Sequence, residues 1–298
     1  MSKFLLSTDS CVDLFKSYLE KNNVGYVILK RITDGTAKSE LYDSDEEYRQ
    51  FYEEIKKGAL PTTSQLNPFD LEEHFKKMLE ENKEGDLIHV SLSSGLSETC
   101  TNAMSVASKM NKTLSDRKIY IVDSLSATLG MAMQVERLIE LRDSGVSAAE
   151  AFKNVENLRD HQHIWAIVGD LFHLKRGGRL SSFKAAVGTL LKVKPVLIVN
   201  DKGKLTIEKK IKGNKVAIEY VLERMEEFGT KAGADFKNNC VYLVHSAANE
   251  QCEQLRSAIK EKFGDINIKE GMIGPIIGTH VGEGTVAVVF EGAKRLSI

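Results

Sequence analysis

Short stretches rich in Ser, Thr and Gly carry the side chains best suited to hold a small anion. They are residues 7–10, 61–65, 91–97 and 123–124. Three of them directly follow apolar, strand-like runs, and α/β sheets bind ligands at the carboxyl ends of their strands. Hydroxyls and free N–H groups at helix starts can hold a carboxylate or a phosphate. The same residues also cap helices, which explains any one stretch alone, but four together favour a shared polar site.

A glycine-rich apolar segment at residues 274–282 contains a single histidine, His280. Glycine allows the backbone to approach a ligand closely or to adopt positive φ. His280 could donate a hydrogen bond to a carboxylate. A core histidine with satisfied hydrogen bonds is an equally good interpretation of the pattern.

A third candidate places cations around a Gly-Gly turn at residues 174–181. Such a cluster could bind a phosphate, a carboxylate or an acidic partner. A basic helix end followed by glycine is also a normal helix C-cap. The cap accounts for Lys175 and Arg176, whereas Arg179 lies beyond the turn and needs another reason.

Nucleotide and hydrolase signatures are missing from the sequence: it has no Gly-x-Ser-x-Gly elbow, no Gly-x-Gly-x-x-Gly fingerprint and no Walker A loop. A Ser-His-Asp triad stays open, because its members can come from distant positions. Its candidates are Ser93, Ser94 or Ser97 as nucleophile, His280 as base and Asp9 or Asp123 as the orienting carboxylate. We therefore keep a Ser-His hydrolase or acyl transferase acting on a lipid-like substrate as the alternative function.

The composition excludes further classes of function. The chain has 298 residues with 41 Lys plus Arg against 42 Asp plus Glu, so it lacks the basic excess of a nucleic-acid binder. Its four cysteines form no Cys-x-x-Cys pair, and the two histidines His161 and His163 alone are a weak metal signal, so we predict no metal and no cofactor. We predict a cytoplasmic protein, because the cysteines are scattered and the apolar run at the N-terminus is short. We predict no transmembrane segment, because no apolar stretch is long enough to span a bilayer.

Strands and helices alternate through the first half of the chain. Strands are predicted at residues 4–7, 26–29, 87–90 and 119–122. Helices are predicted from after Ser10 to about residue 21 and at residues 45–57, 70–82, 97–109 and 127–142. This alternation predicts a parallel, Rossmann-like sheet covered by helices on both faces.

The second half predicts a mixed sheet. Residues 195–199 and 205–210 flank an Asp201-Lys202-Gly203 turn and predict a hairpin. Further strands are predicted at residues 166–168, 241–244, 266–268 and 286–289, and helices at 215–228 and 250–263. We therefore predict two α/β domains, residues 1–157 with the parallel sheet and residues 158–298 with the mixed sheet.

Seven segments, taken in order, resemble the DegV family of bacterial fatty-acid-binding proteins, which includes the binding subunits of fatty-acid kinases. They are Thr8-Asp9-Ser10, residues 61–65, residues 92–97, Val122-Asp123-Ser124, residues 175–180, residues 194–197 and residues 274–282. Each motif is short, but their shared order and spacing over nearly the whole chain make the pattern specific.

The resemblance implies a ligand between the two domains, with an acyl chain in an apolar tunnel. Residues matching the family's head-group motifs are Thr62, Thr63, Ser93, Ser94, Thr279 and His280. Arg176, Arg179 and Lys212 would contact the partner kinase or a phosphate. The kinase carries the nucleotide and phosphorylates the bound carboxyl group, so the resemblance implies a binding protein that is not itself an enzyme.

The sequence departs from the family pattern at three charged positions. Glu98 stands where the family usually has Gly, Glu283 where it has Pro or a small residue, and Lys212 where an Arg is expected. An inward Glu98 would oppose a bound carboxylate, whereas an outward one at a helix start would be favourable. The Lys212 exchange bears on partner docking or acyl-phosphate handling rather than on tail binding.

Overall fold

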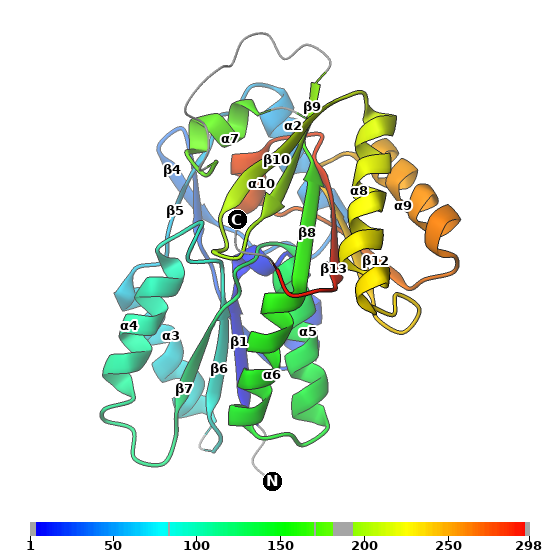
Figure 1. Cartoon of the computed structure of the whole chain (residues 1–298). Coiled ribbons are helices and arrows are strands. Elements are labelled where there is room, and N and C mark those ends of the chain that lie inside the picture. The colour runs from blue at the N-terminus through cyan, green and yellow to red at the C-terminus, as the bar shows by residue number, and fades with distance from the viewer. Residues whose placement is uncertain (1–3, 83, 170, 181–192, 296–298) are drawn as a thin grey trace.

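The computed structural model describes residues 4–82, 84–169, 171–180 and 193–295. Two large sheets and one small sheet make up the fold (Figure 1). The first large sheet is built by the N-terminal half and the second by the C-terminal half, which confirms the predicted α/β class with a parallel and a mixed sheet.

The first sheet has the order β2-β1-β6-β7, and all of its strands are parallel. Its strands are β1 (Leu5–Asp9), β2 (Val24–Val27), β6 (Leu87–Ser91) and β7 (Ile119–Asp123). Its helices are α1 (Lys16–Lys21), α3 (Pro68–Glu81), α4 (Thr99–Met110), α5 (Leu129–Asp143) and α6 (Ala148–His161). In Figure 1, α3 and α4 lie on one side of this sheet and α5 and α6 on the other.

The second sheet has the order β10-β9-β8-β13-β11-β12, antiparallel except for the β11–β12 pair. Its strands are β8 (Gln162–Ile167), β9 (Val193–Val199), β10 (Leu205–Lys212), β11 (Val241–His245), β12 (Ile268–Met272) and β13 (Val286–Glu291). Alternate side chains separate its two faces. Trp165 and Ile167 pack beneath α8 (Asn214–Phe228) and α9 (Asn249–Phe263), whereas Ile164 and Ala166 face the N-terminal half.

The small sheet β4-β3-β5 was not predicted from the sequence. It comprises β3 (Lys30–Thr33), β4 (Thr36–Ser39) and β5 (Thr62–Ser64), and it lies near α2 (Asp45–Lys56) and α10 (Pro275–Val281). Asp34 and Gly35 both have positive φ in the β3–β4 hairpin turn, as a type I′ turn requires. Buried Arg31 bonds Glu40 at 2.9 Å and Glu54 at 2.8 Å, which ties this sheet to α2.

Local signals explain several of the helix starts and stops. Ser44 caps α2, Asn67 precedes Pro68 at the start of α3, and Ser147 forms a capping box with Glu150 in α6. Helix α7 (Phe172–Gly177) ends on Gly178, whose φ of 67° is the left-handed cap expected there. The predicted β9–β10 hairpin is confirmed, and the proposed boundary at residues 157/158 falls inside α6, a helix that the sequence analysis did not predict.

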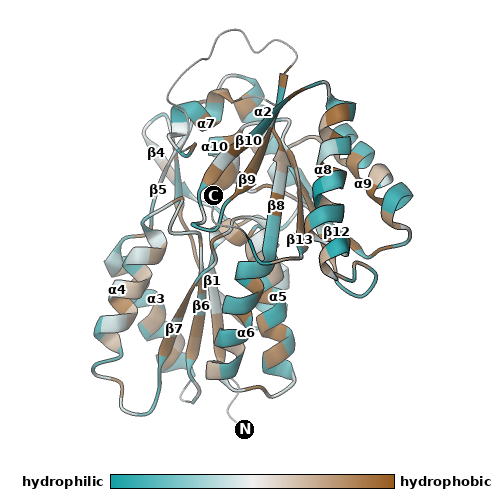
Figure 2. Cartoon of the chain, viewed as in Figure 1, coloured by the Kyte–Doolittle hydropathy of each residue, from teal (hydrophilic) through white to brown (hydrophobic). Residues whose placement is uncertain are grey.

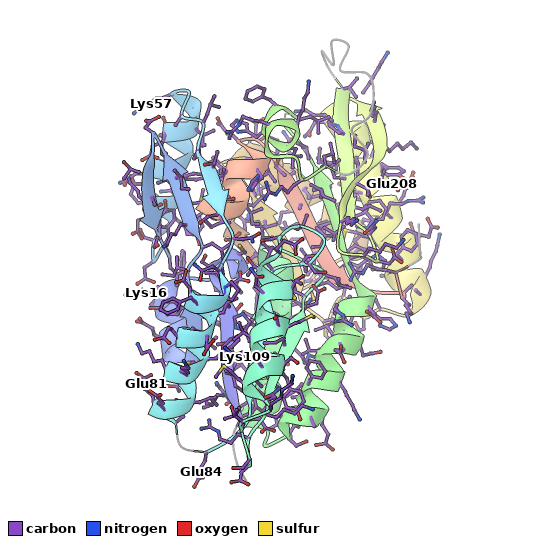
Figure 3. The ribbon with its side chains drawn as sticks, turned by 90° about the vertical axis from the view of Figure 1, so that its left-hand side faces the viewer. Lys16, Lys57, Glu81, Glu84, Lys109 and Glu208 are labelled. Atoms are coloured by element: carbon purple, nitrogen blue, oxygen red, sulfur yellow. The ribbon has the colours of Figure 1, made fainter. Side chains whose placement is uncertain are left out.

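Apolar residues concentrate on the strands, and hydrophilic residues on the outer helices (Figure 2). Charged side chains such as Lys57, Glu81 and Glu84 lie at the periphery of the molecule (Figure 3). Among the described residues, no helix has both the length and the apolar character needed to cross a bilayer. Two short 3-10 turns, Ser10–Val12 and Thr230–Ala232, complete the described elements.

Candidate functional site

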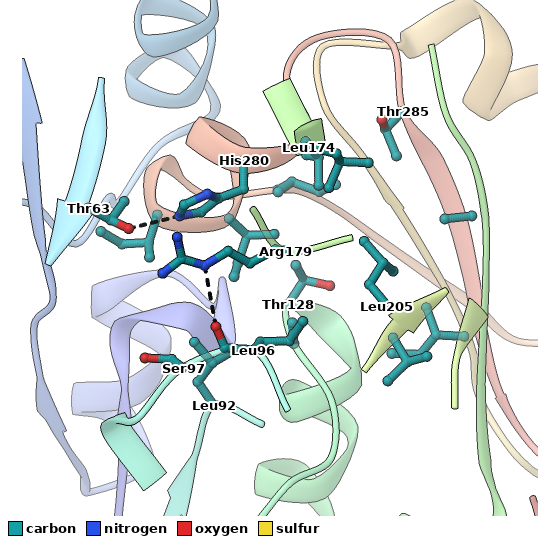
Figure 4. A pocket seen from close by; sticks show the side chains of 18 of the residues that line it. Thr63, Leu92, Leu96, Ser97, Thr128, Leu174, Arg179, Leu205, His280 and Thr285 are labelled. Atoms are coloured by element: carbon teal, nitrogen blue, oxygen red, sulfur yellow. Dashed lines mark hydrogen bonds between the residues drawn. The ribbon is translucent and has the colours of Figure 1, made fainter. Parts of the chain in front are cut away.

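A cavity with about 860 Å³ of empty space, part of it open to solvent, lies between the parallel sheet and the inner face of the mixed sheet (Figure 4). The mixed sheet contributes Ile164, Ala166, Val199, Val244 and Ala287. Side chains from both halves of the chain thus line one shared cavity.

Hydrocarbon side chains form most of the remaining wall. From α7, α10 and the short loop between β12 and α10 come Leu174, Ile273, Ile276, Ile277 and Val281. Leu29, Leu92, Leu96 and Ala127 come from loops of the N-terminal half. Such walls favour an apolar ligand, because burial of apolar surface is the main source of affinity there.

Polar side chains gather at one end of the cavity. Thr63 and Ser64 come from β5, Ser97 precedes α4, Arg179 follows α7 and His280 belongs to α10. Thr63 Oγ lies 2.8 Å from His280 Nε2, and the two are joined by a hydrogen bond (Figure 4). Four segments that are distant in sequence thus converge on one polar end.

His280 is neutral at physiological pH. Burial, together with the guanidinium groups of Arg179 and Arg176, lowers its pKa to about 4. Its Nδ1 is buried and has no hydrogen-bond partner among the described residues. A Cβ at Gly177 would lie 2.4 Å from that nitrogen, so the glycine lets α7 pack closely against the ring.

The two arginines near His280 are held by main-chain oxygens. Arg179 bonds the carbonyls of Leu96 at 3.4 Å and Gly177 at 2.6 Å, and Arg176 bonds those of Leu60 and Pro61. Within the described ranges, no carboxylate pairs with either guanidinium. Arg179 is exposed at the cavity mouth and keeps its charge available for an anion.

Of the predicted head-group residues, Thr63 and His280 line the cavity and the other four do not. Thr62 is exposed, and the hydroxyl of Thr279 bonds the Pro275 carbonyl within α10. Ser93 donates to the Gly203 carbonyl at 2.8 Å, and Ser94 donates to Asp123 at 2.5 Å.

Among the cations assigned to a partner or a phosphate, Arg179 lines the cavity. Arg176 lies beside it, since it contributes to the lowered pKa of His280. Lys212 is exposed at the end of β10 and does not line the cavity.

Several lining residues were not singled out as site residues by the sequence. Ser64 and Gln65 belong to the 61–65 motif, but only its threonines were taken as contacts. Thr128 lines the cavity with a φ of 53°, and Thr285 lines it from the position directly before β13. The sequence could not assign either threonine to the cavity, because their place in it depends on how the two sheets face each other.

The candidate catalytic triad is not assembled. Ser93 and Ser94 bond other partners, Ser97 Oγ lies 3.0 Å from Thr99 Oγ1, and His280 bonds Thr63. Asp9 instead accepts from the N–H groups of Cys11 and Leu92. In the described part of the chain, His280 therefore has neither a serine nucleophile nor an orienting carboxylate in hydrogen-bond contact.

One group of metal-binding side-chain types lies outside the cavity. The ligand atoms of His245, Cys252 and Glu270 lie within 4.8 Å of one another. The N–H of Ala248 donates to His245 Nδ1 at 3.3 Å, which leaves the proton on Nε2, facing Glu270. Arg256 also pairs with Glu270. The group is thus explained by hydrogen bonds and an ion pair.

The unusual acidic residues point away from the polar end. Glu98 is exposed at the start of α4, the position where a negative charge is favourable. Glu283 approaches Lys56 at 3.9 Å. Neither residue lines the cavity.

A family model described as "Uncharacterised protein, DegV family" matches residues 3–293. A DegV domain-containing protein of Clostridium perfringens is 33% identical over 295 residues, covering 99% of each chain. The crystal structure of DegV from Bacillus subtilis, described as a fatty acid binding protein, superposes with a TM-score of 0.82 at 27% identity, covering 98% of this chain and 100% of that one.

A DegV family protein from Thermus thermophilus, described by its fatty acid binding, gives a TM-score of 0.85 at 26% identity, covering 98% of this chain and 100% of that one. A stearic-acid-binding protein from Eubacterium ventriosum shares the fold at 22% identity with a TM-score of 0.80. The family-model match and the curated relative agree over almost the entire sequence, and on that evidence the chain belongs to the DegV family.

Proposed function

We propose that this protein binds a long-chain fatty acid in the cavity, with the carboxylate at Thr63, His280 and Arg179. The observation that carries the proposal is an apolar cavity whose polar end holds a guanidinium without a carboxylate partner among the described residues. The solved DegV structures named for fatty acid binding support the same ligand class.

Tail burial and head-group contacts both contribute to this affinity. About 15 methylenes at about 0.8 kcal/mol each give a gross gain of about 12 kcal/mol on burial. Lost translational and rotational freedom costs about 4–15 kcal/mol. Head-group contacts therefore decide whether binding is tight, and a hydrogen bond to a charged group adds about 1.5–3 kcal/mol.

The polar end suits an ionised carboxylate. Arg179 supplies a fixed positive charge, while neutral His280 and the hydroxyl of Thr63 supply hydrogen bonds. Because a negative charge favours protonation of a nearby imidazole, the incoming carboxylate would raise the pKa of His280. The remaining predicted residues would not touch the head group but would help to position the segments around it. They are Thr62, Ser93, Ser94 and Thr279.

We further propose that the protein presents its ligand to a cytoplasmic kinase and does not itself transform it. Arg176 and Lys212 are the residues proposed to meet the kinase or the phosphorylated head group. Arg176 lies near the polar end, and Lys212 is an exposed cation. The domains proposed are residues 1–157 and 158–298, with the ligand between them.

Mass spectrometry of an organic extract tests the binding proposal. Protein purified after bacterial expression is expected to yield near-stoichiometric fatty acid. His280→Ala and Arg179→Ala are expected to weaken binding by about tenfold or more, because each removes a head-group contact. His161→Ala and Arg49→Ala are matched controls, since neither side chain lines the cavity.

An empty extract, followed by failure to bind added fatty acids, would overturn the proposal. Turnover of a lipid ester that requires Ser97 and His280 would instead support the hydrolase or acyl transferase alternative. If both His280→Ala and Arg179→Ala kept full affinity for fatty acid, the carboxylate would have to bind elsewhere than at this polar end.

A further inference from the structure

The ladder between β8 and β9 stops early. Its pairs are Trp165 with Ile198, Ala166 with Leu197 and Ile167 with Val196. The next pair in this register would join Ile164 with Val199, but it is not part of the described ladder. Each strand continues with its other neighbour, Ile164 against Val289 of β13 and Val199 against Leu205 of β10. The sheet therefore forks at Ile164 and Val199.

A second cavity lies at this fork. It has about 460 Å³ of empty space, part of it open to solvent, and shares Ile164 and Val199 with the larger cavity. Its other apolar lining residues are Trp165, Ile198 and Phe228, and its polar ones are His163, Asn200, Asp201, Glu208 and Arg295. Trp165 and Ile198 belong to the opposite face of the mixed sheet, the one that packs beneath α8 and α9. The two shared side chains thus separate a cavity on one face from a cavity on the other.

We infer that Ile164 and Val199 set the longest acyl chain that this protein holds, an inference that rests on the proposed fatty-acid function. A tail that grows along the larger cavity ends against these two side chains. Beyond these two residues the described β8–β9 ladder does not continue. The next surfaces that the tail meets are the apolar faces of Trp165 and Phe228.

Val244 also lines the larger cavity, but it lies on a strand, β11, that is paired on both sides. Its partners there are Gly271 of β12 and Ala287 of β13. Truncating Val244 adds local space but opens no route through the sheet, since the ladder hydrogen bonds remain.

Dissociation constants of delipidated protein for a series of saturated fatty acids test the inference. Each methylene that is buried tightens binding by about fourfold, so the wild type is expected to improve with length up to a break and then to stop improving. Val199→Ala and Ile164→Ala are expected to move this break to longer chains. Val244→Ala, which removes the same two methyl groups as Val199→Ala, is expected to leave the break where the wild type has it.

Thermal unfolding of each variant identifies any that fails to fold, and Val199→Ala is the milder of the two changes. An unchanged break in a folded Val199→Ala protein would overturn the inference, as would an equal shift in Val244→Ala. Failure of the wild type to bind any member of the series would instead overturn the proposed function.

Discussion

Ser93 joins the two halves of the molecule. Its hydroxyl donates to the Gly203 carbonyl in the turn of the β9–β10 hairpin at 2.8 Å. A Cβ on Gly203 would lie 2.0 Å from this hydroxyl oxygen, and a Cβ on Gly95 would lie 2.5 Å from the Gly203 carbonyl. Both glycines are therefore needed for the close approach, and the buried serine satisfies a carbonyl at this junction.

The variant Ser93→Ala is expected to lower the free energy of unfolding by about 1–3 kcal/mol, because it leaves the Gly203 carbonyl without its partner. Fatty-acid affinity is expected to change by less than about twofold, since Ser93 does not line the cavity. Urea unfolding and a binding titration measure the two effects, with exposed Ser115→Ala as the control. A large loss of affinity at unchanged stability would place Ser93 at the head group instead.

At the scale of single residues, the sequence indicates which types of side chain are available but not where they point. His280 and Thr63 were predicted from their motifs and meet at the cavity. Ser93 lies in an equally suggestive motif, yet its partner is 110 positions away in the chain. Arg179 was noticed because no helix cap explains it, and its position at the cavity mouth supplies the reason.

At the scale of elements, a half-buried histidine on α3, His74, packs beside a fully buried histidine on β6, His89. The rings of His74 and His89 lie 6.1 Å apart, and Ser7 Oγ lies 2.7 Å from His89 Nδ1. Burial lowers the pKa of His74 to about 4 and that of His89 well below its usual value, and the neighbouring imidazole adds to the effect on His89. Both rings are neutral in the folded protein at pH 7.

Acid is therefore expected to weaken the packing of α3 on the parallel sheet. Below the ordinary pKa of 6.5 the unfolded chain binds protons that the folded chain does not, so stability is complete above pH 6.5 and is lost as the pH falls towards 4. Between pH 7 and 4.5, the unfolding free energy of the wild type is expected to fall by about 1 kcal/mol or more beyond the fall in the His89→Gln variant. Urea unfolding of both proteins at the two pH values measures this difference, and equal losses would contradict it.

The elements that the sequence predicted best are those with a strong local pattern. The apolar run of β6 and the capped, amphipathic α2 and α3 need no tertiary contact to be recognised. The small sheet was missed because β4 is exposed throughout and its neighbour β3 alternates weakly. That sheet depends on Arg31 and its two glutamates, a contact between segments that a local pattern cannot reveal.

Over the whole molecule, Glu136 connects the two domains. This buried carboxylate on α5 accepts hydrogen bonds from Tyr18 of α1 and Tyr242 of β11, and it pairs with Lys269 of β12 at 2.5 Å. With the Ser93 contact, it fixes the distance between the parallel and mixed sheets. The cavity is lined by residues of both halves, so its shape could not be predicted from either half alone.

Removal of the ligand is expected to destabilise the whole chain, because a fatty acid that binds only the folded state stabilises it by mass action. Free fatty acid at about 100 times its dissociation constant adds about 2.7 kcal/mol to the free energy of unfolding. Thermal unfolding of delipidated protein with and without added palmitate measures the effect. Butyrate, which keeps the carboxylate but not the tail, is the control, and an equal response to both acids would contradict tail burial.

The cavity between the two sheets also has a consequence for the amount of protein in a cell. An empty molecule lacks part of its own interior, so we expect it to open more often than a filled one. Proteases remove chains in proportion to the time they spend open. The proposed function therefore predicts that the protein is degraded faster when fatty acid is scarce. Its cellular concentration would then follow the fatty-acid concentration without a dedicated regulator.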